Sequence, residues 1–306
     1  MALLRAPVRP GSHHSRPRHL RAEDRLIRLA DGRRLGYAES GDPGGRPVLF
    51  FHGFGTTRVV CPSDQPAVER GLRLIAVDRP GIGLSDSSPG RRLLDWPADI
   101  AQLVERLELE DMSVIGWSGG GPYALAVAHE LAGRVRSVAI VSGPAPLAGA
   151  ATDQGYLRRL DRHAVRAADR APWVIRLAMW HWGRPQRRDA AAYFDRSVAE
   201  MCAADQAVVG QPELRSRMIA NSSELYRQGG RGMYDEALVL ARPWGFNLAD
   251  LRVPVHIWHG DRDDTVPPAM GDHLARHIQN ARLRMFPGEG HHLLYTHWTE
   301  ILSAFE

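Results

Sequence analysis

The sequence of 306 residues contains no lysine, so its basic residues are all arginines. A chain without lysine cannot form a Schiff base through a lysine amine or bind phosphate with a Walker-type lysine, and both classes of enzyme are excluded. Cysteine is almost as scarce. Cys61 and Cys202 lie far apart, which predicts neither a metal site nor a disulfide framework and favours a reducing cytoplasm as the compartment.

Long apolar runs are also missing. No stretch approaches the roughly 18 uncharged apolar residues that a membrane-spanning helix needs, so we expect no membrane span. Hydrophobic residues make up 44% of the chain and charged residues 24%, which is ordinary for a globular protein. The length suits one large α/β domain or such a domain with an insertion. Nothing in the sequence indicates an oligomeric state.

Positive charge is concentrated at the N-terminus. Residues 1–22 contain five arginines and no acidic residue, although the formal net charge of the whole chain is only +4, so the remaining chain is close to neutral. Residues 1–22 lack the apolar run of a signal peptide, and we expect them to form a disordered basic tail. We expect no nucleic-acid partner; contact of the tail with nucleic acid or a membrane surface is the alternative.

The rest of the chain alternates between strand and helix patterns. A hairpin is predicted where residues 26–29 and 35–38 flank an Asp31-Gly32 turn signal. Alternation of this kind predicts a mostly parallel sheet with helices on both faces. The further predicted strands are residues 47–51, 72–77, 112–117, 135–141, 253–258 and 283–286. The predicted helices are residues 98–107, 122–131, 268–277 and a last helix from about residue 293.

Residues 145–246 interrupt this alternation. They contain arginine-rich amphipathic segments and no obvious strand, so we predict a helical cap inserted into a core formed by residues 23–144 and 247–306. Half of the chain's tryptophans lie in this cap, and we expect them to face the apolar surface of the core. They are Trp173, Trp180, Trp182 and Trp244.

A G-x-S-x-G pattern at residues 116–120 is the strongest chemical signal. It follows a predicted buried strand and opens a predicted helix, which is the context of a nucleophile elbow centred on Ser118. A serine on so sharp a turn takes strained backbone angles, and Gly116 and Gly120 leave room for the neighbouring strand and helix. The helix N-terminus adds positive potential and free N–H groups beside the serine.

A serine hydroxyl needs a base, and the base needs an orienting group. Two later loops supply candidates, each directly after a predicted strand and hence at the carboxyl edge of the sheet. The candidate acids are Asp261, Asp263 and Asp264. The candidate bases are His291 and His292. The chain order is therefore serine, acid, histidine.

From residue 24 onward the chain resembles the α/β-hydrolase superfamily, in the branch with a helical cap. Five motifs in family order carry the resemblance: residues 52–55 (HGFG), 78–85 (DRPGIGLS), 116–120 (GWSGG), 260–267 (GDRDDTVP) and 290–291 (GH). The resemblance implies that Asp263 is the acid and His291 the base. It also implies an oxyanion hole made by the backbone N–H groups of Phe54 and Gly119. We expect His52, in the same loop, to be a structural hydrogen-bonding residue; a catalytic role is the alternative.

The resemblance implies a serine hydrolase that acts on carboxylic esters or related small acyl compounds, with no metal and no organic cofactor. A serine nucleophile argues against haloalkane dehalogenases and epoxide hydrolases, which use aspartate at that position. The elbow also differs from the Gly-Gly-Ser-Trp-Gly form of proline iminopeptidases. Thioesterases, lactonases, other aminopeptidases, C–C bond hydrolases and haloperoxidase-like members stay open, as do a non-hydrolytic biosynthetic enzyme and a ligand receptor.

Overall fold

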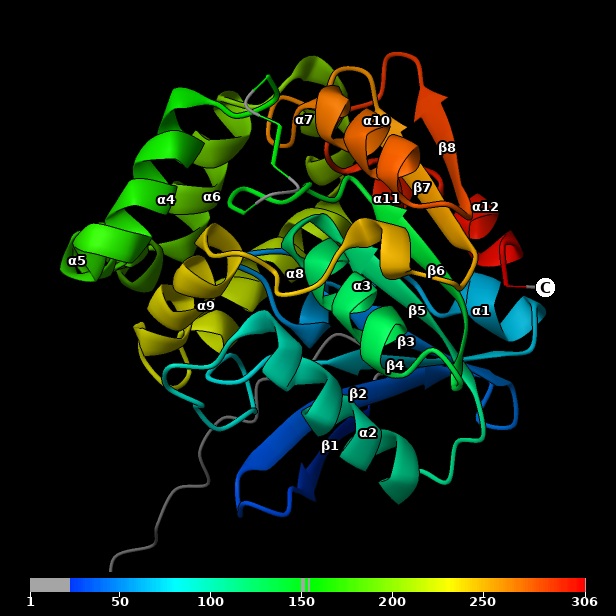
Figure 1. Ribbon diagram of the computed structural model, residues 1–306. Helices are drawn as coiled ribbons and strands as arrows, with labels where there is room; N and C mark the ends of the chain where they lie inside the picture. The colour runs from blue at the N-terminus through cyan, green and yellow to red at the C-terminus, as the bar shows by residue number, and fades with distance from the viewer. Residues whose placement is uncertain (1–22, 150–151, 154, 306) are drawn as a thin grey trace, which may run out of the picture.

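The computed structural model describes residues 23–149, 152–153 and 155–305 (Figure 1). An eight-stranded sheet has the order β1-β2-β4-β3-β5-β6-β7-β8. The two pairs that involve β2 are antiparallel and the other five pairs are parallel, so the sheet is mostly parallel, as predicted. The strands are β1 (Glu23–Arg28), β2 (Arg34–Gly41), β3 (Arg46–Phe51), β4 (Leu72–Val77), β5 (Met112–Trp117), β6 (Val135–Val141), β7 (Val255–Gly260) and β8 (Ala281–Phe286). The predicted disordered tail, residues 1–22, lies outside the described residues.

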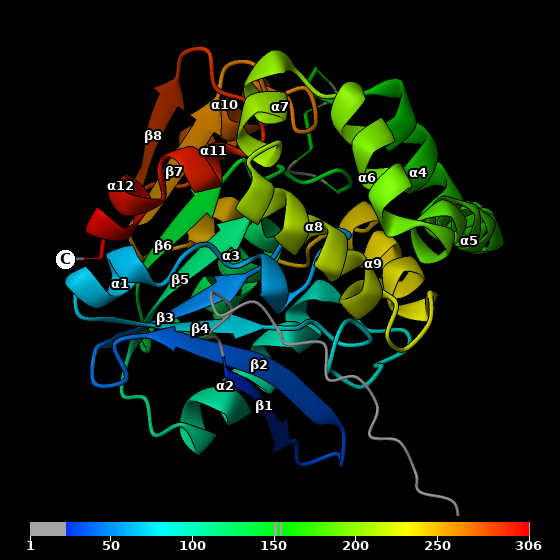
Figure 2. The same ribbon diagram turned by 180° about the vertical axis from the view of Figure 1, so that it is seen from behind.

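Apolar side chains alternate between the two faces of the sheet. On β3, Leu49 and Phe51 join one buried cluster, whereas Val48 and Phe50 join the other. Runs that are apolar at every position therefore form the buried parallel strands. The first face is covered by α2 (Trp96–Arg106), α3 (Gly121–Glu130) and α10 (Pro268–His277). The second is covered by α1 (Gln65–Glu69), α11 (Leu293–Thr296) and α12 (Trp298–Ser303) (Figures 1 and 2).

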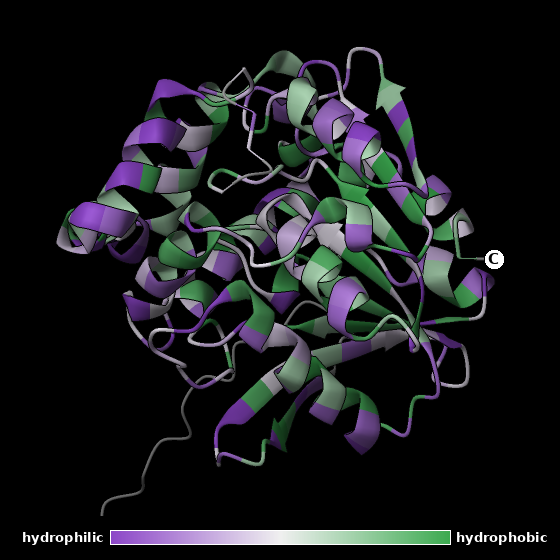
Figure 3. Cartoon of the chain, in the orientation of Figure 1, coloured by the Kyte–Doolittle hydropathy of each residue, from purple (hydrophilic) through white to green (hydrophobic). Residues whose placement is uncertain are grey.

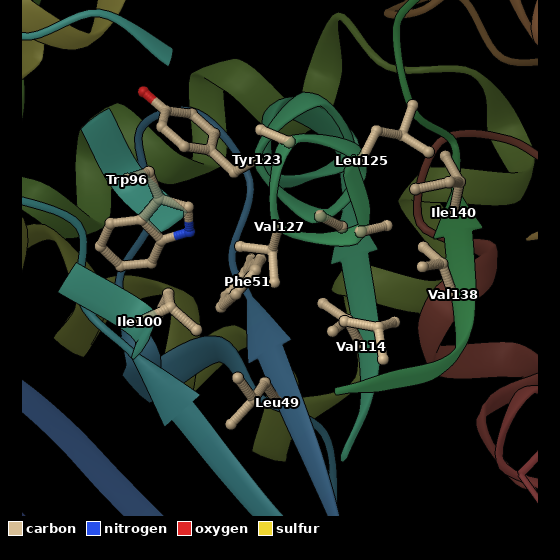
Figure 4. Close-up of a cluster of buried hydrophobic side chains, with 14 of the residues drawn as sticks. Leu49, Phe51, Trp96, Ile100, Val114, Tyr123, Leu125, Val127, Val138 and Ile140 are labelled. Atoms are coloured by element: carbon tan, nitrogen blue, oxygen red, sulfur yellow. The ribbon is translucent and has the colours of Figure 1, made fainter. Parts of the chain in front are cut away.

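Aromatic side chains join the first cluster to the sheet. Trp96 of α2 lies edge-on to Phe51, with ring centroids 5.3 Å apart, and also contacts Tyr123 of α3 (Figure 4). Since α3 follows the Ser118 turn directly, this packing fixes the helix that begins at the candidate nucleophile. Short 3-10 helices complete this part of the fold: η1 (Arg58–Val60), η2 (Leu93–Asp95), η3 (Ser118–Gly120) and η4 (Leu248–Asp250).

The predicted last helix begins at Leu293, as expected, but it is divided into two short helices, α11 and α12. The break falls at His297. The His297 ring lies 4.2 Å from the ring of Phe286 and its Nε2 lies 3.1 Å from Glu289 Oε1. These contacts hold the His297 side chain against β8 and the loop after it, at the residue that separates α11 from α12.

The described residues between β6 and β7 form a helical segment without strands, which we define as residues 159–241. It consists of α4 (Arg159–Arg170), α5 (Pro172–Arg188), α6 (Ala190–Ala199), α7 (Ala203–Val209), α8 (Pro212–Leu225) and α9 (Arg231–Ala241). Figure 3 shows α4 largely in the hydrophilic colour, in keeping with its arginines. None of the helices in the described ranges is both long and apolar enough to cross a membrane.

The orientation of the tryptophans is only partly as expected. Trp244, which follows α9, is buried, and Trp182 packs toward the core. Trp173 and Trp180 instead point to solvent, with exposed fractions of 66% and 52%. The reason is the register of α5, since residues 173 and 180 lie on the face opposite Trp182.

Candidate active site

Ser118 lies in the turn between β5 and η3, at the carboxyl end of the sheet. Its φ angle is 51°, in the left-handed region that is unfavourable for any residue other than glycine. A Cβ on Gly116 would lie 2.6 Å from the carbonyl oxygen of Gly120, and one on Gly120 would overlap backbone oxygens at the end of β3. The turn is therefore possible only with glycine at both positions, which is the steric reason for the motif.

The structure brings Ser118, His291 and Asp263 into one hydrogen-bonded chain. Ser118 Oγ lies 2.9 Å from His291 Nε2, and His291 Nδ1 lies 2.9 Å from Asp263 Oδ2. All three residues are buried, although they come from three separate loops. If Nδ1 carries the proton and donates it to Asp263, Nε2 is free to accept the hydroxyl proton of Ser118.

Within this hydrogen-bonded chain, neighbouring charges shift the pKa values of both Asp263 and His291. Burial raises the pKa of Asp263, but the neighbouring His291 and His259 outweigh burial and hold that pKa well below its ordinary value. Burial likewise lowers the pKa of His291, but the Asp263 carboxylate outweighs burial and raises it above its ordinary value. The site thus stabilises a positive imidazolium beside Ser118.

Asp263 alone among the three candidate acids contacts His291. Its other oxygen, Oδ1, accepts the N–H groups of Thr265 at 2.9 Å and Val266 at 2.7 Å, which fixes the carboxylate. Asp261 is used differently, since its Oδ1 accepts the N–H of Gly288 at 2.7 Å and closes the turn after β8. Asp264 is exposed.

Asp205, which the sequence analysis missed, holds the histidine loop from the helical segment. It is buried on α7, and its oxygens accept the N–H groups of His291 at 2.9 Å and His292 at 2.7 Å. A Cβ on Gly290 would lie 2.5 Å from this carboxylate, so glycine is needed before the histidine. No signal in the sequence marked it, because residues 189–211 contain three other acidic residues that look alike: Asp189, Asp195 and Glu200.

Trp117, inside the elbow, supports the same loop. Its indole N–H donates to the His291 carbonyl at 3.3 Å, and its ring lies 5.8 Å from the imidazole of His291. His292 points elsewhere, with Nδ1 3.3 Å from Asp205. The two neighbouring histidines therefore have separate positions, and only His291 reaches the serine.

The loop after β3 lies directly against the elbow. A Cβ on Gly119 would lie 2.9 Å from Phe54 N, and one on Gly53 would lie 3.2 Å from Ser118 Cβ. Among the hydrogen bonds of the described residues, the Phe54 N–H has no acceptor. An unpaired N–H beside a serine hydroxyl is available to a ligand.

The carbonyl of Gly53 belongs to the same peptide unit as the Phe54 N–H. This carbonyl accepts hydrogen bonds from three side chains. Arg79 Nη2 donates to it at 2.9 Å, Thr56 Oγ1 at 2.8 Å and His52 Nδ1 at 3.0 Å. Hydrogen bonds to a carbonyl polarise its peptide and strengthen the N–H as a donor. Burial and the charge of Arg79 keep the pKa of His52 well below its ordinary value, so its ring is neutral.

A buried ion pair ties this loop to the helical segment. Arg79 is fully buried and its Nε donates to Glu236 Oε1 of α9 at 2.8 Å. Arg79 stands in the 78–85 motif, where Asp78 in turn accepts from the side chain of Arg58 at 2.7 Å. The motif is thus a structural support behind the site. Glu236 was not found from the sequence.

An apolar wall faces the serine from the helical segment. The ring of Trp182 on α5 is stacked on Phe54, with centroids 5.9 Å apart. Met233 packs in the same cluster, and Leu240 would lie 3.4 Å from a Cβ on Gly119. In the described ranges, no group of three or more histidine, cysteine, aspartate or glutamate side chains could hold a metal ion.

Comparison with known proteins places this chain in a family. The model of the alpha/beta hydrolase fold family matches residues 46–297, and the chain belongs to that family. It is 29% identical to a non-heme chloroperoxidase of Streptomyces lividans over 90% of this chain and 96% of the relative. It is 30% identical to a non-heme haloperoxidase of Rhodococcus erythropolis, covering 87% and 92% of the two chains.

A solved structure of another protein has the same fold. The esterase EaEST of Exiguobacterium antarcticum superposes with a TM-score of 0.68 at 20% identity, covering 92% of this chain and 98% of the other. The family assignment makes the protein a member of a hydrolase family.

Proposed function

We propose that the protein is a serine hydrolase that cleaves carboxylic esters or related acyl compounds through a covalent acyl-enzyme. The hydrogen-bonded chain Ser118–His291–Asp263 carries this proposal. His291 accepts the Ser118 proton as Oγ attacks the substrate carbonyl. Asp263 holds the imidazole and stabilises its charged form.

The oxyanion of the tetrahedral intermediate binds to the N–H groups of Phe54 and Gly119. His291 then gives its proton to the leaving alkoxide, the C–O bond breaks, and the acyl group stays on Ser118. Water attacks the acyl-enzyme with His291 as base, and the acid is released. The scheme requires no metal and no organic cofactor.

We assign residues 145–246 as a cap over a core of residues 23–144 and 247–306. Trp182 stacked on Phe54 supports this assignment, because it brings a helix of the segment to the oxyanion loop. An apolar acyl or alcohol group fits beside Trp182, Met233 and Leu240.

Perhydrolysis is a second candidate, favoured by the two haloperoxidase relatives. Hydrogen peroxide would replace water as the attacking group on the same acyl-enzyme and release a peracid. The Ser118 chemistry up to that step is unchanged.

Labelling with a fluorophosphonate, followed by peptide mapping, tests the nucleophile. We expect one adduct, at Ser118, and none on S118A. A panel of esters, thioesters, lactones and aminoacyl amides then identifies the substrate class, and an arm with acetate and peroxide measures peracid formation. An S118A protein that hydrolyses p-nitrophenyl esters at the wild-type rate would refute the proposal.

A further inference from the structure

Exposed apolar side chains gather on two adjacent helices of the helical segment. Seven large hydrophobic side chains of the described residues are exposed, and five of them belong to α4 and α5. They are Leu160, Trp173, Val174, Leu177 and Trp180. Scattered single residues of this kind are normal on a protein surface, but a gathered set marks an interaction site.

Helix α5 carries two apolar faces. Residues 173, 177, 180 and 184 follow one another at spacings of three and four and so share the outer face. Ile175, Trp182 and Gln186 share the opposite face, which is packed against the protein. The fold uses only the inner face, so Trp173, Leu177 and Trp180 are not needed for packing and need another explanation.

Positive charge surrounds this outer face of α5. Eight arginines and two aspartates lie in residues 159–188, and all eight arginines are exposed. Arg184 lies over the ring of Trp180, 5.6 Å from its centroid. Beside this face, Arg176, Arg187 and Arg231 line a surface pocket of about 390 Å³ together with Trp180. Such a pocket suits a single anionic group.

We propose that the outer face of α4 and α5 docks on the surface of a bilayer that contains anionic phospholipids. Tryptophan rings are favoured at the boundary between acyl chains and headgroups, and arginines extend from it to phosphates. The arginine-lined pocket would bind a lipid phosphate. The outer-face side chains Trp173, Leu177 and Trp180 would enter the boundary between the acyl chains and the headgroups. The helix lies on the surface and does not span the membrane.

Charge argues against a second copy of this chain as the occupant. A two-fold dimer through this face would bring the exposed arginines of both copies together, and like charges across an interface are unfavourable. In Figures 1 and 2, α5 projects at the side of the molecule away from β8, which leaves it accessible to a flat surface. Bilayer contact would place lipid on one side of the helix whose other side carries Trp182 at the proposed site.

Flotation of the full-length protein with vesicles tests this docking. We expect binding to phosphatidylcholine vesicles with 30% phosphatidylglycerol, weaker binding to pure phosphatidylcholine, and loss of the difference at high salt. W173S/L177S/W180S should lower binding to anionic vesicles by roughly 100-fold. R176Q/R184Q should lower it by roughly 25-fold and leave binding to neutral vesicles unchanged. Vesicle binding needs no substrate, so its outcome is separate from the proposed reaction.

Matched controls separate this face from the rest of the molecule. L26S/V68S removes exposed apolar side chains of β1 and α1 and should bind within about twofold of wild type. Unchanged melting temperatures show that each variant folds. Wild-type binding by the triple variant overturns the proposal, as does a vesicle-free dimer that the triple variant abolishes. Binding lost only on neutralising the arginines of residues 1–22 also overturns it; these are Arg5, Arg9, Arg16, Arg18 and Arg21.

Discussion

Replacing Asp205 by asparagine should impair the site without touching any reacting atom. The carboxylate accepts two buried backbone N–H groups, those of His291 and His292. A hydrogen bond to a charged group contributes about 1.5–3 kcal/mol. Asparagine keeps one acceptor oxygen and loses the other together with the charge, so D205N should lower the free energy of unfolding by about 2–3 kcal/mol.

The activity of D205N should change in two ways. A displaced His291 loop lengthens the contact with Ser118, and a misplacement of about 1 Å costs roughly 100-fold in kcat. The Asp205 charge is also among those that raise the pKa of His291. In the proposed reaction His291 acts as a base only when neutral, so removing that charge should move the acid limb of the kcat/KM profile to lower pH.

The pH dependence of stability follows from the sign of the Asp205 shift. Burial raises the pKa of Asp205, but the contacts to His292 and to the loop N–H groups outweigh it, and the folded pKa lies below 3.8. Its stabilisation is thus present above pH 3.8 and is lost as pH falls through the folded pKa. Urea unfolding should show the full difference between D205N and wild type at pH 6 and a shrinking difference below pH 4.

A neighbouring carboxylate supplies the control. Asp264 also raises the pKa of His291, but it is exposed. D264N should move the acid limb in the same direction while leaving unfolding unchanged. A D205N protein with wild-type kcat, an unmoved acid limb and wild-type stability would show that Asp205 does not position His291.

Three further substitutions test the surroundings of the serine. G120A places a methyl group against backbone oxygens at the end of β3 and should abolish soluble folded protein, whereas G133A, with nothing within 4 Å, should keep the wild-type melting temperature. D263N should lower kcat by roughly 10³–10⁴-fold with little change in KM, and a smaller than tenfold loss would contradict its role. E236Q leaves the buried charge of Arg79 without its carboxylate and should cost about 3–5 kcal/mol in urea unfolding; an unchanged midpoint would show that the pair is not needed.

The sheet could be predicted because its signals are local. β4, β5 and β6 are apolar at nearly every position, and such runs identify strands that are buried on both faces. The elbow is local too, since the requirement for glycine around Ser118 comes from atoms within a few residues and from the adjacent strand. The loops of Asp263 and His291 follow β7 and β8, and these strands are neighbours in the sheet, so the loops lie side by side.

The residues that support the site could not be predicted, because their contacts are not local in the sequence. Asp205 and Glu236 act on residues far away in the chain, and nothing beside them in the sequence marks their partners. An amphipathic pattern also cannot say which of two apolar faces of a helix packs inward. Trp182 and Trp180 both satisfy the pattern for α5, yet only Trp182 turns toward the site.

The carboxylate of α7 limits how this enzyme can be redesigned. Exchanging the helices between β6 and β7 is an obvious route to new substrates, because Trp182 on α5 stacks on Phe54 in the loop after β3. A chimera that also replaces α7 would lose the anchor of the histidine loop and would lower turnover on every substrate alike. Libraries should therefore vary α4 to α6 and retain Asp205 together with Gly290, the residue that makes room for it.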